Sequence, residues 1–530
     1  MLTLDQAARF LGQATFGPKF SEIGSLSGTT VSSWLNAQFN VGTASHKEYM
    51  DTVIANSPPG TKFSHNNTFE TFWTQAVTGP DQLRQRVKFA LSQIFVVSLI
   101  DSGVGNKPRG MASYYDTLGA HAFGNFRNLL EAVTLHPMMG VYLAMLRNQK
   151  ESGNRVPDQN YAREIMQLFT IGLYMLNLDG SPKLSGGNPI ETYTPADIVG
   201  LSRVFTGWSW YGPDKTDFRF RGGNLDADAD WRPMQSYPQF HSTLEKMFLG
   251  VRIPASNTPD PEGDLRIALD TLFNHPNVGP FIGKQLIQHL VTSNPSALYV
   301  GRVAQVFNDN GQGVRGDLKA VVKAILTDTE ARQAPDILAP NVGKLREPIL
   351  RMTNWMRAFN CSSASGRFMI ANIDDPLIGI GQNPFRSPSV FNYFRPGYVP
   401  PNSSIAGSGL VAPEMQLTAE TSVTGYLNTM RDVIVNGIGS TNINGNPKRD
   451  VQPSYTVELT LADLPAELVD RVSLLLTGRK ITTTLRDQII TAISAIYVSN
   501  DPVQAPIGRQ NRVSATIFLM MASPEYLVQK

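Results

Sequence analysis

One segment, residues 158–172, carries polar side chains at a spacing that suits chemistry. Asn160, Arg163, Glu164 and Gln167 are three or four positions apart, so on a helix they form one narrow stripe. Most other positions are apolar, which predicts a buried helix whose stripe faces solvent or an internal cavity. Either the charged pair ties helices together, or it lines a site in which Glu164 is an acid or base and Arg163 and Asn160 bind a carboxylate.

Three histidines are candidates to share that chemistry, because they titrate near neutral pH. His121 and His136 flank a helix predicted over residues 125–133, and His241 follows a long loop that returns to an apolar segment. Side chains near helix boundaries reach clefts or bond terminal backbone groups. We include all three as catalytic candidates, with a structural role as the alternative for each.

Three carboxylates at alternate positions, Asp226, Asp228 and Asp230, resemble the start of a calcium-binding loop. Trp231 occupies the sixth position and Tyr237 the twelfth, where an EF-hand needs Gly and Glu, so an EF-hand is excluded. A looser calcium site and a solvated acidic turn are the two remaining interpretations.

Aromatic and proline-rich loops supply the candidate binding walls. Proline fixes the backbone and aromatic rings supply packing surface, so residues 381–398 are expected to form a rigid loop. Its amides and arginines suit a planar or anionic ligand such as a sugar acid, or they lock the loop onto the helices. The residues assigned to substrate binding are Tyr161, Trp208, Trp210, Gln382, Arg386, Asn392 and Arg395.

The elements that must position these residues are mostly helices. Apolar residues recur at three-and-four spacing over Leu4–Ala14 and in many later segments, and Asp158 is expected to cap the helix over 160–173. Strand signals are few, and the best lies at 454–461. Further helices are predicted over residues 82–99, 125–133, 265–273, 278–291, 318–326, 342–359, 469–476, 485–497 and 512–521.

The fold class is therefore mainly α, a large multi-helical core with long aromatic-rich loops and little β structure. We predict a main helical domain over residues 1–435, with long loops inserted at 178–237 and 374–413. A linker rich in Asn and Gly follows at 436–453, before a small C-terminal helical unit at 454–530 that packs on the main domain.

Composition excludes several classes of protein. The 530 residues carry a formal charge of only +2, which argues against a nucleic-acid binder that relies on bulk positive charge. The single cysteine, Cys361, excludes an intrachain disulfide and any multi-cysteine metal site. No apolar stretch approaches the roughly 18 residues of a membrane span, and no secretory signal is visible. Walker, dinucleotide, Gly-x-Ser-x-Gly and His-Glu-x-x-His motifs are all missing.

Six segments resemble the bacterial family catalogued as domain of unknown function 1800. They are residues 7–17, 160–172, 204–208, 344–348, 381–398 and 521–526, which together reach across almost the whole chain. One departure is Phe169, where a histidine often stands in the family's motif. The resemblance implies a large helical bacterial protein, commonly exported to the periplasm or outside the cell. It also implies a neighbouring partner similar to sulfatases and alkaline phosphatases.

These observations lead to one main hypothesis and two alternatives. The main hypothesis is an exported enzyme, a lyase or hydrolase, that acts on a polysaccharide or another anionic polymer in a cleft above the polar stripe. The first alternative is a non-catalytic partner or cell-surface assembly protein. The second is a metal- or haem-dependent oxidoreductase with histidine ligands. Calcium is the one cofactor suggested by the residues.

Overall fold

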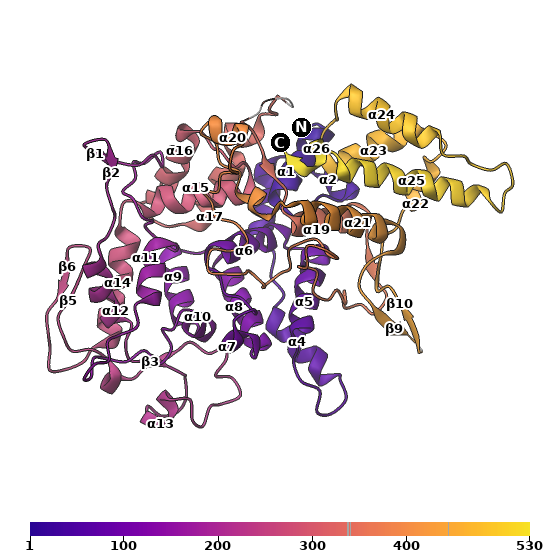
Figure 1. Ribbon diagram of the computed structural model, residues 1–530. Coiled ribbons are helices and arrows are strands. Elements are labelled where there is room, and N and C mark those ends of the chain that lie inside the picture. The colour runs from indigo at the N-terminus through magenta and orange to yellow at the C-terminus, as the bar shows by residue number, and fades with distance from the viewer. Residues whose placement is uncertain (337–338, 340, 444) are drawn as a thin grey trace.

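The chain folds mainly into α-helices in the computed structural model, which describes residues 1–336, 339, 341–443 and 445–530 (Figure 1). The described residues form 26 α-helices, two short 3-10 helices (η1 and η2) and 12 short strands, and the strands pair only as antiparallel two-stranded ladders. The predicted fold class is confirmed. Within the described part of the chain, no helix combines the length and the apolar character needed to cross a bilayer.

The first 150 residues form helices α1 to α10. They are α1 (Leu4–Ala14), α2 (Phe20–Ser27), α3 (Val31–Phe39), α4 (His46–Ala55), α5 (His65–Thr78), α6 (Gln82–Ile94), α7 (Ser102–Gly105), α8 (Pro108–His121), α9 (Phe126–Leu135) and α10 (Pro137–Tyr142). Helix α1 begins and ends at the predicted residues. Thr3 and Gln6 form a capping box that fixes its start. Its buried side includes Ala7, Leu11 and Ala14, as the spacing predicts.

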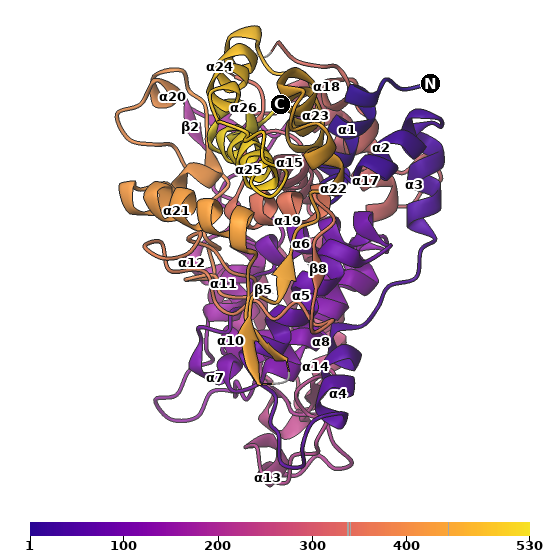
Figure 2. The same cartoon turned by 90° about the vertical axis from the view of Figure 1, so that its right-hand side faces the viewer.

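The middle third adds helices that alternate with short strand pairs. The helices are α11 (Asn160–Gln167), α12 (Pro195–Val204), α13 (Asp217–Phe220), η1 (Pro238–Phe240), α14 (Pro261–Asn274), α15 (Val278–Leu290), α16 (Ala297–Asn308), α17 (Leu318–Thr327) and α18 (Thr329–Arg332). The strands are β1 (Leu184–Ser185), β2 (Asn188–Pro189), β3 (Trp208–Ser209), β4 (Gln235–Ser236), β5 (Lys246–Phe248) and β6 (Val251–Ile253). The segment with α13 lies at the end of the molecule opposite the chain termini (Figures 1 and 2).

The last third returns to the beginning of the chain. Its helices are α19 (Pro348–Ala358), α20 (Ser404–Gly407), η2 (Pro413–Leu417), α21 (Glu420–Asn436), α22 (Thr456–Thr460), α23 (Pro465–Thr477), α24 (Thr483–Ser494), α25 (Ala505–Ala522) and α26 (Pro524–Leu527). Its strands are β7 (Lys344–Leu345), β8 (Ser362–Ser363), β9 (Thr441–Ile443), β10 (Asn446–Lys448), β11 (Val451–Gln452) and β12 (Val528–Gln529). One hydrophobic cluster runs from Ala7 to Tyr526, so the C-terminal helices share a core with α1.

Several element predictions differ from the structure. The helix predicted over 82–99 ends at Ile94, and the helix predicted over 512–521 begins at Ala505. Residues 454–461 hold the helix α22 rather than a strand, so that prediction is wrong: the backbone N–H of Leu459 donates to the carbonyl of Tyr455 within a helical turn. The helix predicted over 342–359 begins at Pro348, where proline at its start fits the first turn. The helix predicted to reach residue 173 ends at Gln167, before Gly172 takes a φ of +70°.

The described residues of the predicted linker at 436–453 are folded; residue 444 lies outside the part of the chain that the structure describes. Strands β9 and β10 pair with each other, and β11 pairs with β8. The buried Asp450 carboxylate accepts hydrogen bonds from the Ser363 hydroxyl and from the backbone N–H groups of Ser365 and Met369. The segment is therefore attached to the residues after α19, and the proposed domain division stays a prediction.

Candidate functional site

Helix α11 carries the predicted polar stripe, and its first turn is capped as expected. The Asp158 carboxylate accepts a hydrogen bond from the backbone N–H of Asn160 at 2.8 Å. The apolar side of the helix is buried: the Tyr161 hydroxyl donates to Thr134 Oγ1 at 2.7 Å, and its ring packs edge-on against Phe205. Tyr161 is therefore a packing residue inside the core, not an accessible binding residue.

The stripe passes from solvent into the interior. Asn160 and Arg163 are exposed, whereas Glu164 is only 6% exposed. Its Oε2 is buried with no hydrogen-bond partner among the described residues. Burial raises the pKa of Glu164, and the nearby Arg163 opposes that rise only in part. At the end of the stripe, Gln167 Oε1 accepts a hydrogen bond from the Tyr193 hydroxyl at 3.2 Å.

A cleft of about 660 Å³ opens beside the start of α11. Its lining includes Lys107 from before α8, Arg147 and Arg155 from the segment between α10 and α11, Asp158, and the ring of Trp210. The basic side chains outnumber the single carboxylate in this lining. We call this feature the cationic cleft.

The cations of the cleft differ in how far they are neutralised. Lys107 Nζ forms an ion pair with Asp230 at 2.6 Å and lies 5.1 Å from the Trp210 ring centroid. Arg147 and Arg155 donate instead to the backbone carbonyls of Arg221 and Lys150. Neither of these two arginines takes part in an ion pair within the described part of the chain. Their charge is free to attract an anion.

The backbone of the cleft is strained. Ala144 and Arg147 have φ values of 59° and 66°, a left-handed conformation that costs non-glycine residues of order 1–3 kcal/mol each. The surrounding hydrogen bonds hold them there: the N–H of Arg147 donates to the carbonyl of Trp208 at 2.9 Å, and the N–H of Leu146 donates to that of Gly140. This turn directs Arg147 into the cleft. Strained residues of this kind cluster at binding and catalytic sites.

The three predicted calcium ligands point to different partners. Asp226 pairs with Arg219 at 3.2 Å, Asp228 pairs with Arg232 at 2.7 Å, and Asp230 pairs with Lys107. The residues that the structure describes contain no cluster of three or more groups that could hold a metal ion. The calcium site therefore stays a prediction without a converging ligand set.

The three candidate histidines lie in separate environments. His241 is fully buried, with Nδ1 at 2.7 Å from the Thr206 carbonyl and Nε2 at 2.9 Å from Asp264 Oδ2. His136 caps α10 by accepting from the N–H of Met138, and burial lowers its pKa to about 3. His121 is half-buried at the end of α8, and burial lowers its pKa. No contact joins any of them to Glu164 in the described structure, so their catalytic roles stay predictions.

A comparison with protein-family models decides the family. The model of the family described as a protein of unknown function (DUF1800) matches residues 9–528, nearly the whole chain. The chain belongs to the DUF1800 family. No curated protein and no solved structure matches it.

In this DUF1800 protein, the proline-rich loop at 381–398 is fixed to the helices. Gln382 is buried, where its Nε2 donates to Glu347 Oε2 at 2.7 Å and its Oε1 accepts from the N–H of Ile349. Arg386 pairs with Asp374 at 2.7 Å. Asn392 is also buried, and its Oδ1 accepts from the Ser387 hydroxyl. Gln382 thus fixes the loop to the start of α19, whereas Arg386 and Asn392 make contacts within residues 374–398.

One predicted binding residue is exposed to solvent: Arg395, which lies over the Phe391 ring, 4.4 Å from its centroid. Trp210 contributes to the wall of the cationic cleft with only 5% of its surface exposed. Trp208, in the strand β3, is 4% exposed and does not line that cleft. The structure thus divides the predicted binding set between structural and accessible positions.

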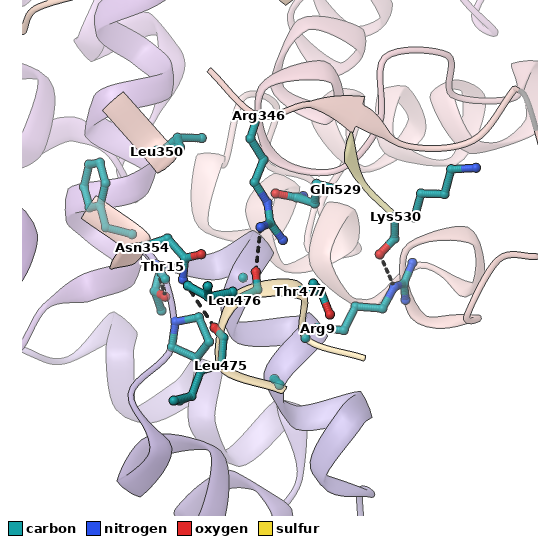
Figure 3. A pocket seen from close by; sticks show the side chains of 16 residues that line it. Arg9, Thr15, Arg346, Leu350, Asn354, Leu475, Leu476, Thr477, Gln529 and Lys530 are labelled. Atoms are coloured by element: carbon teal, nitrogen blue, oxygen red, sulfur yellow. Dashed lines mark hydrogen bonds between the residues drawn. The ribbon is translucent and has the colours of Figure 1, made fainter. Parts of the chain in front are cut away.

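A small cavity lies between α1 and the C-terminal residues Gln529 and Lys530 (Figure 3). Its volume of about 20 Å³ admits roughly one water molecule. Arg9 Nε donates to the carbonyl of Lys530 at 3.1 Å, and Arg346 Nη1 donates to that of Leu476 at 2.6 Å (Figure 3). This cavity is a seam between α1, α19 and α23, and its size excludes a substrate.

Sequence reasoning missed Lys107, Arg147 and Arg155. They come from separate positions with no shared motif, and only the position of Arg155, three residues before Asp158, places one of them near the stripe. Their convergence depends on the turn at residues 144–147, which periodicity does not reveal.

Proposed function

We propose that this DUF1800 protein binds an anionic polymer, an acidic polysaccharide, in the cationic cleft, and acts on it as a lyase or hydrolase. The observation that carries the proposal is the pair of exposed arginines, Arg147 and Arg155, beside Trp210 in one cleft of about 660 Å³. Guanidinium groups bind carboxylates and sulfates through paired hydrogen bonds. The neighbouring indole edge gives a sugar ring an apolar contact.

Glu164 is the proposed acid of the reaction. Burial raises its pKa, so its carboxyl group keeps its proton to a higher pH than an exposed glutamate does. Glu164 is not itself among the residues that line the cleft, and it lies on α11 six residues after the lining residue Asp158. In hydrolysis, Glu164 donates its proton to the leaving oxygen as the glycosidic bond breaks, water adds to the anomeric carbon, and the proton released from that water returns to Glu164. Arg147 and Arg155 hold the acidic groups of the polymer.

Binding tests the first half of the proposal. Polygalacturonate is expected to bind and neutral dextran is not, with affinity falling as salt rises. Arg147→Gln and Arg155→Gln are each expected to weaken polygalacturonate binding about tenfold. The control is Arg486→Gln, a half-buried arginine on α24 that pairs with Asp470 outside the cleft. Equal binding of both polymers, or an equal effect of all three variants, would contradict the proposal.

Turnover tests the second half. Glu164→Gln keeps the shape of the side chain and removes the titratable proton, so it is expected to abolish release of new chain ends from the polymer while leaving polygalacturonate affinity unchanged. Specific binding with no turnover by the wild type would instead support the alternative of a non-catalytic partner or cell-surface protein.

We further propose a periplasmic or extracellular location, where acidic polysaccharides are accessible, and a sulfatase- or phosphatase-like partner that removes acidic groups from the same polymer. Fractionation of native cells tests the location. Recovery of the protein only in the cytoplasmic fraction would overturn it.

A further inference from the structure

A second cavity, separate from the cationic cleft, lies where the end of α11 meets α15 and the loop at 374–413. Its volume is about 280 Å³. Phe281 of α15 and Phe391 and Phe394 of the loop contribute to its walls, together with aliphatic side chains. A pocket of this volume with apolar walls can hold a flat hydrocarbon group such as an aromatic ring. We call it the aromatic pocket.

Two buried polar side chains, Gln93 and His289, also line the aromatic pocket. They are 8% and 5% exposed, and Gln93 Oε1 and His289 Nδ1 have no hydrogen-bond partner among the described residues. The position of the Gln93 amide is fixed, because its Nε2 donates to Glu347 Oε2 at 2.6 Å. A buried acceptor left unpaired costs about 1–3 kcal/mol, which a ligand that donates a hydrogen bond would recover.

The His289 ring adds no charge to this end of the pocket. Burial, together with Lys344 and Arg86, lowers the pKa of His289 well below its usual value. Lys344 and Arg86 both donate to the His289 carbonyl, and Lys344 pairs with Glu414 at 2.9 Å. The buried end is therefore polar and neutral on its surface, so it selects an uncharged donor such as a hydroxyl group.

The remaining lining includes a cation. Arg395 is exposed and stacks over Phe391, and it forms no ion pair with any described residue. An anionic group on a ligand can therefore reach it without displacing a protein carboxylate.

We infer that the aromatic pocket binds a small aromatic carboxylic acid, with its ring between the phenylalanines, its carboxylate on Arg395 and a hydroxyl group donating to Gln93 Oε1. This site is independent of the proposed polysaccharide cleft. The three recognition elements each correspond to one chemical feature of the ligand, so they are separable by experiment.

Isothermal titration with three probes tests the inference. Phenylacetate carries the ring and the carboxylate, 4-hydroxyphenylacetate adds the hydroxyl, and tyramine replaces the carboxylate with an amine. The expected order of affinity is 4-hydroxyphenylacetate, then phenylacetate, then tyramine. Arg395→Gln is expected to weaken binding of both acids about tenfold and not to weaken binding of tyramine, whose ammonium group Arg395 repels.

Two further variants locate the site. Leu173 lines the pocket and is 48% exposed, so Leu173→Trp is expected to fill the pocket and abolish binding of both acids without disturbing the core. Arg147→Gln, in the cationic cleft, is expected to leave binding of the acids unchanged. Equal affinity for all three probes, or acid binding that survives Leu173→Trp, would overturn the inference.

Polygalacturonate binding distinguishes the inference about the aromatic pocket from the proposed function of the cationic cleft. Arg395→Gln is expected to leave polymer binding unchanged, and loss of polymer binding in that variant would refute two independent sites. Failure of polygalacturonate to bind the wild type refutes the polymer proposal alone, because the small acids report on the aromatic pocket.

Discussion

Replacement of His136 by asparagine tests whether this histidine is buried and neutral or available for acid–base chemistry. Its side chain is 4% exposed, it caps α10 by accepting from the N–H of Met138 at 3.2 Å, and its ring packs edge-on against Tyr114. Asparagine is also a good N-cap, so His136→Asn keeps a capping acceptor while removing the titrating ring.

The magnitude follows from the pKa of His136, which burial lowers from an ordinary value of 6.5 to about 3. A lowered histidine pKa means that the unfolded chain binds a proton that the folded chain rejects. The stability is therefore fully present above pH 6.5 and is lost as pH falls from 6.5 towards 3. Between pH 7 and pH 5 this loss amounts to about 2 kcal/mol, at 1.36 kcal/mol per pH unit.

The assay is urea unfolding of the wild type and His136→Asn at pH 7 and pH 5. All other groups titrate alike in both proteins, so the difference between their two pH dependences isolates His136. The wild type is expected to lose about 2 kcal/mol more than the variant over this range.

Ring NMR of the seven histidines gives a direct check on the same expectation. The His136 signals should show no protonation from pH 7 down to pH 5. Equal pH dependence of the two proteins, or a His136 titration near pH 6.5, would refute the reasoning and restore His136 as a candidate acid–base group.

Three further predictions concern buried positions. Lys344→Met leaves the buried Glu414 carboxylate without its ion pair, so the free energy of unfolding, measured by urea titration, is expected to fall by about 3–5 kcal/mol. A smaller fall in the double variant Lys344→Met/Glu414→Leu would confirm that the unpaired carboxylate causes the loss. Gly200→Ala places a Cβ 1.7 Å from a backbone oxygen of β5 and is expected to prevent soluble expression. Gly24→Ala, in contrast, has open space around the new methyl group and is expected to raise the free energy of unfolding by about 0.5–1 kcal/mol. Burial raises the pKa of the Cys361 thiol, so maleimide should label it only after unfolding, and rapid labelling of the native protein would show that this region opens.

Much of the architecture could be predicted because hydrophobic periodicity is a local property. The spacing of apolar residues located α1, α9, α15 and α17 to within a few residues. Long-range contacts explain the failures: residues 454–461 carry β-branched side chains typical of strands, yet the Tyr455 hydroxyl accepts from Trp355 Nε1 and donates to the Ile434 carbonyl, which holds the segment in the core.

The polar stripe on α11 shows how much of a candidate site the spacing of residues can predict. Its spacing predicted one shared polar face that looks onto either solvent or an internal cavity, and in the structure Arg163 on that face is exposed whereas Glu164 is buried. The same pattern did not separate accessible residues from structural ones. Gln382 and Tyr161 have the right chemical types for binding, but both are buried with their polar atoms bonded to the protein.

The sequence by itself determined the mainly helical class, the family and the polar stripe, since each depends on residue types at short spacing. Only the tertiary structure decided which cations meet. Lys107, Arg147 and Arg155 form one cleft because a strained turn brings them to the start of α11. Gln93, His289 and Arg395 line the aromatic pocket at the other end of α11, although they are about 100 residues or more apart in the chain. Such convergence depends on the packing of distant helices, which no local pattern encodes.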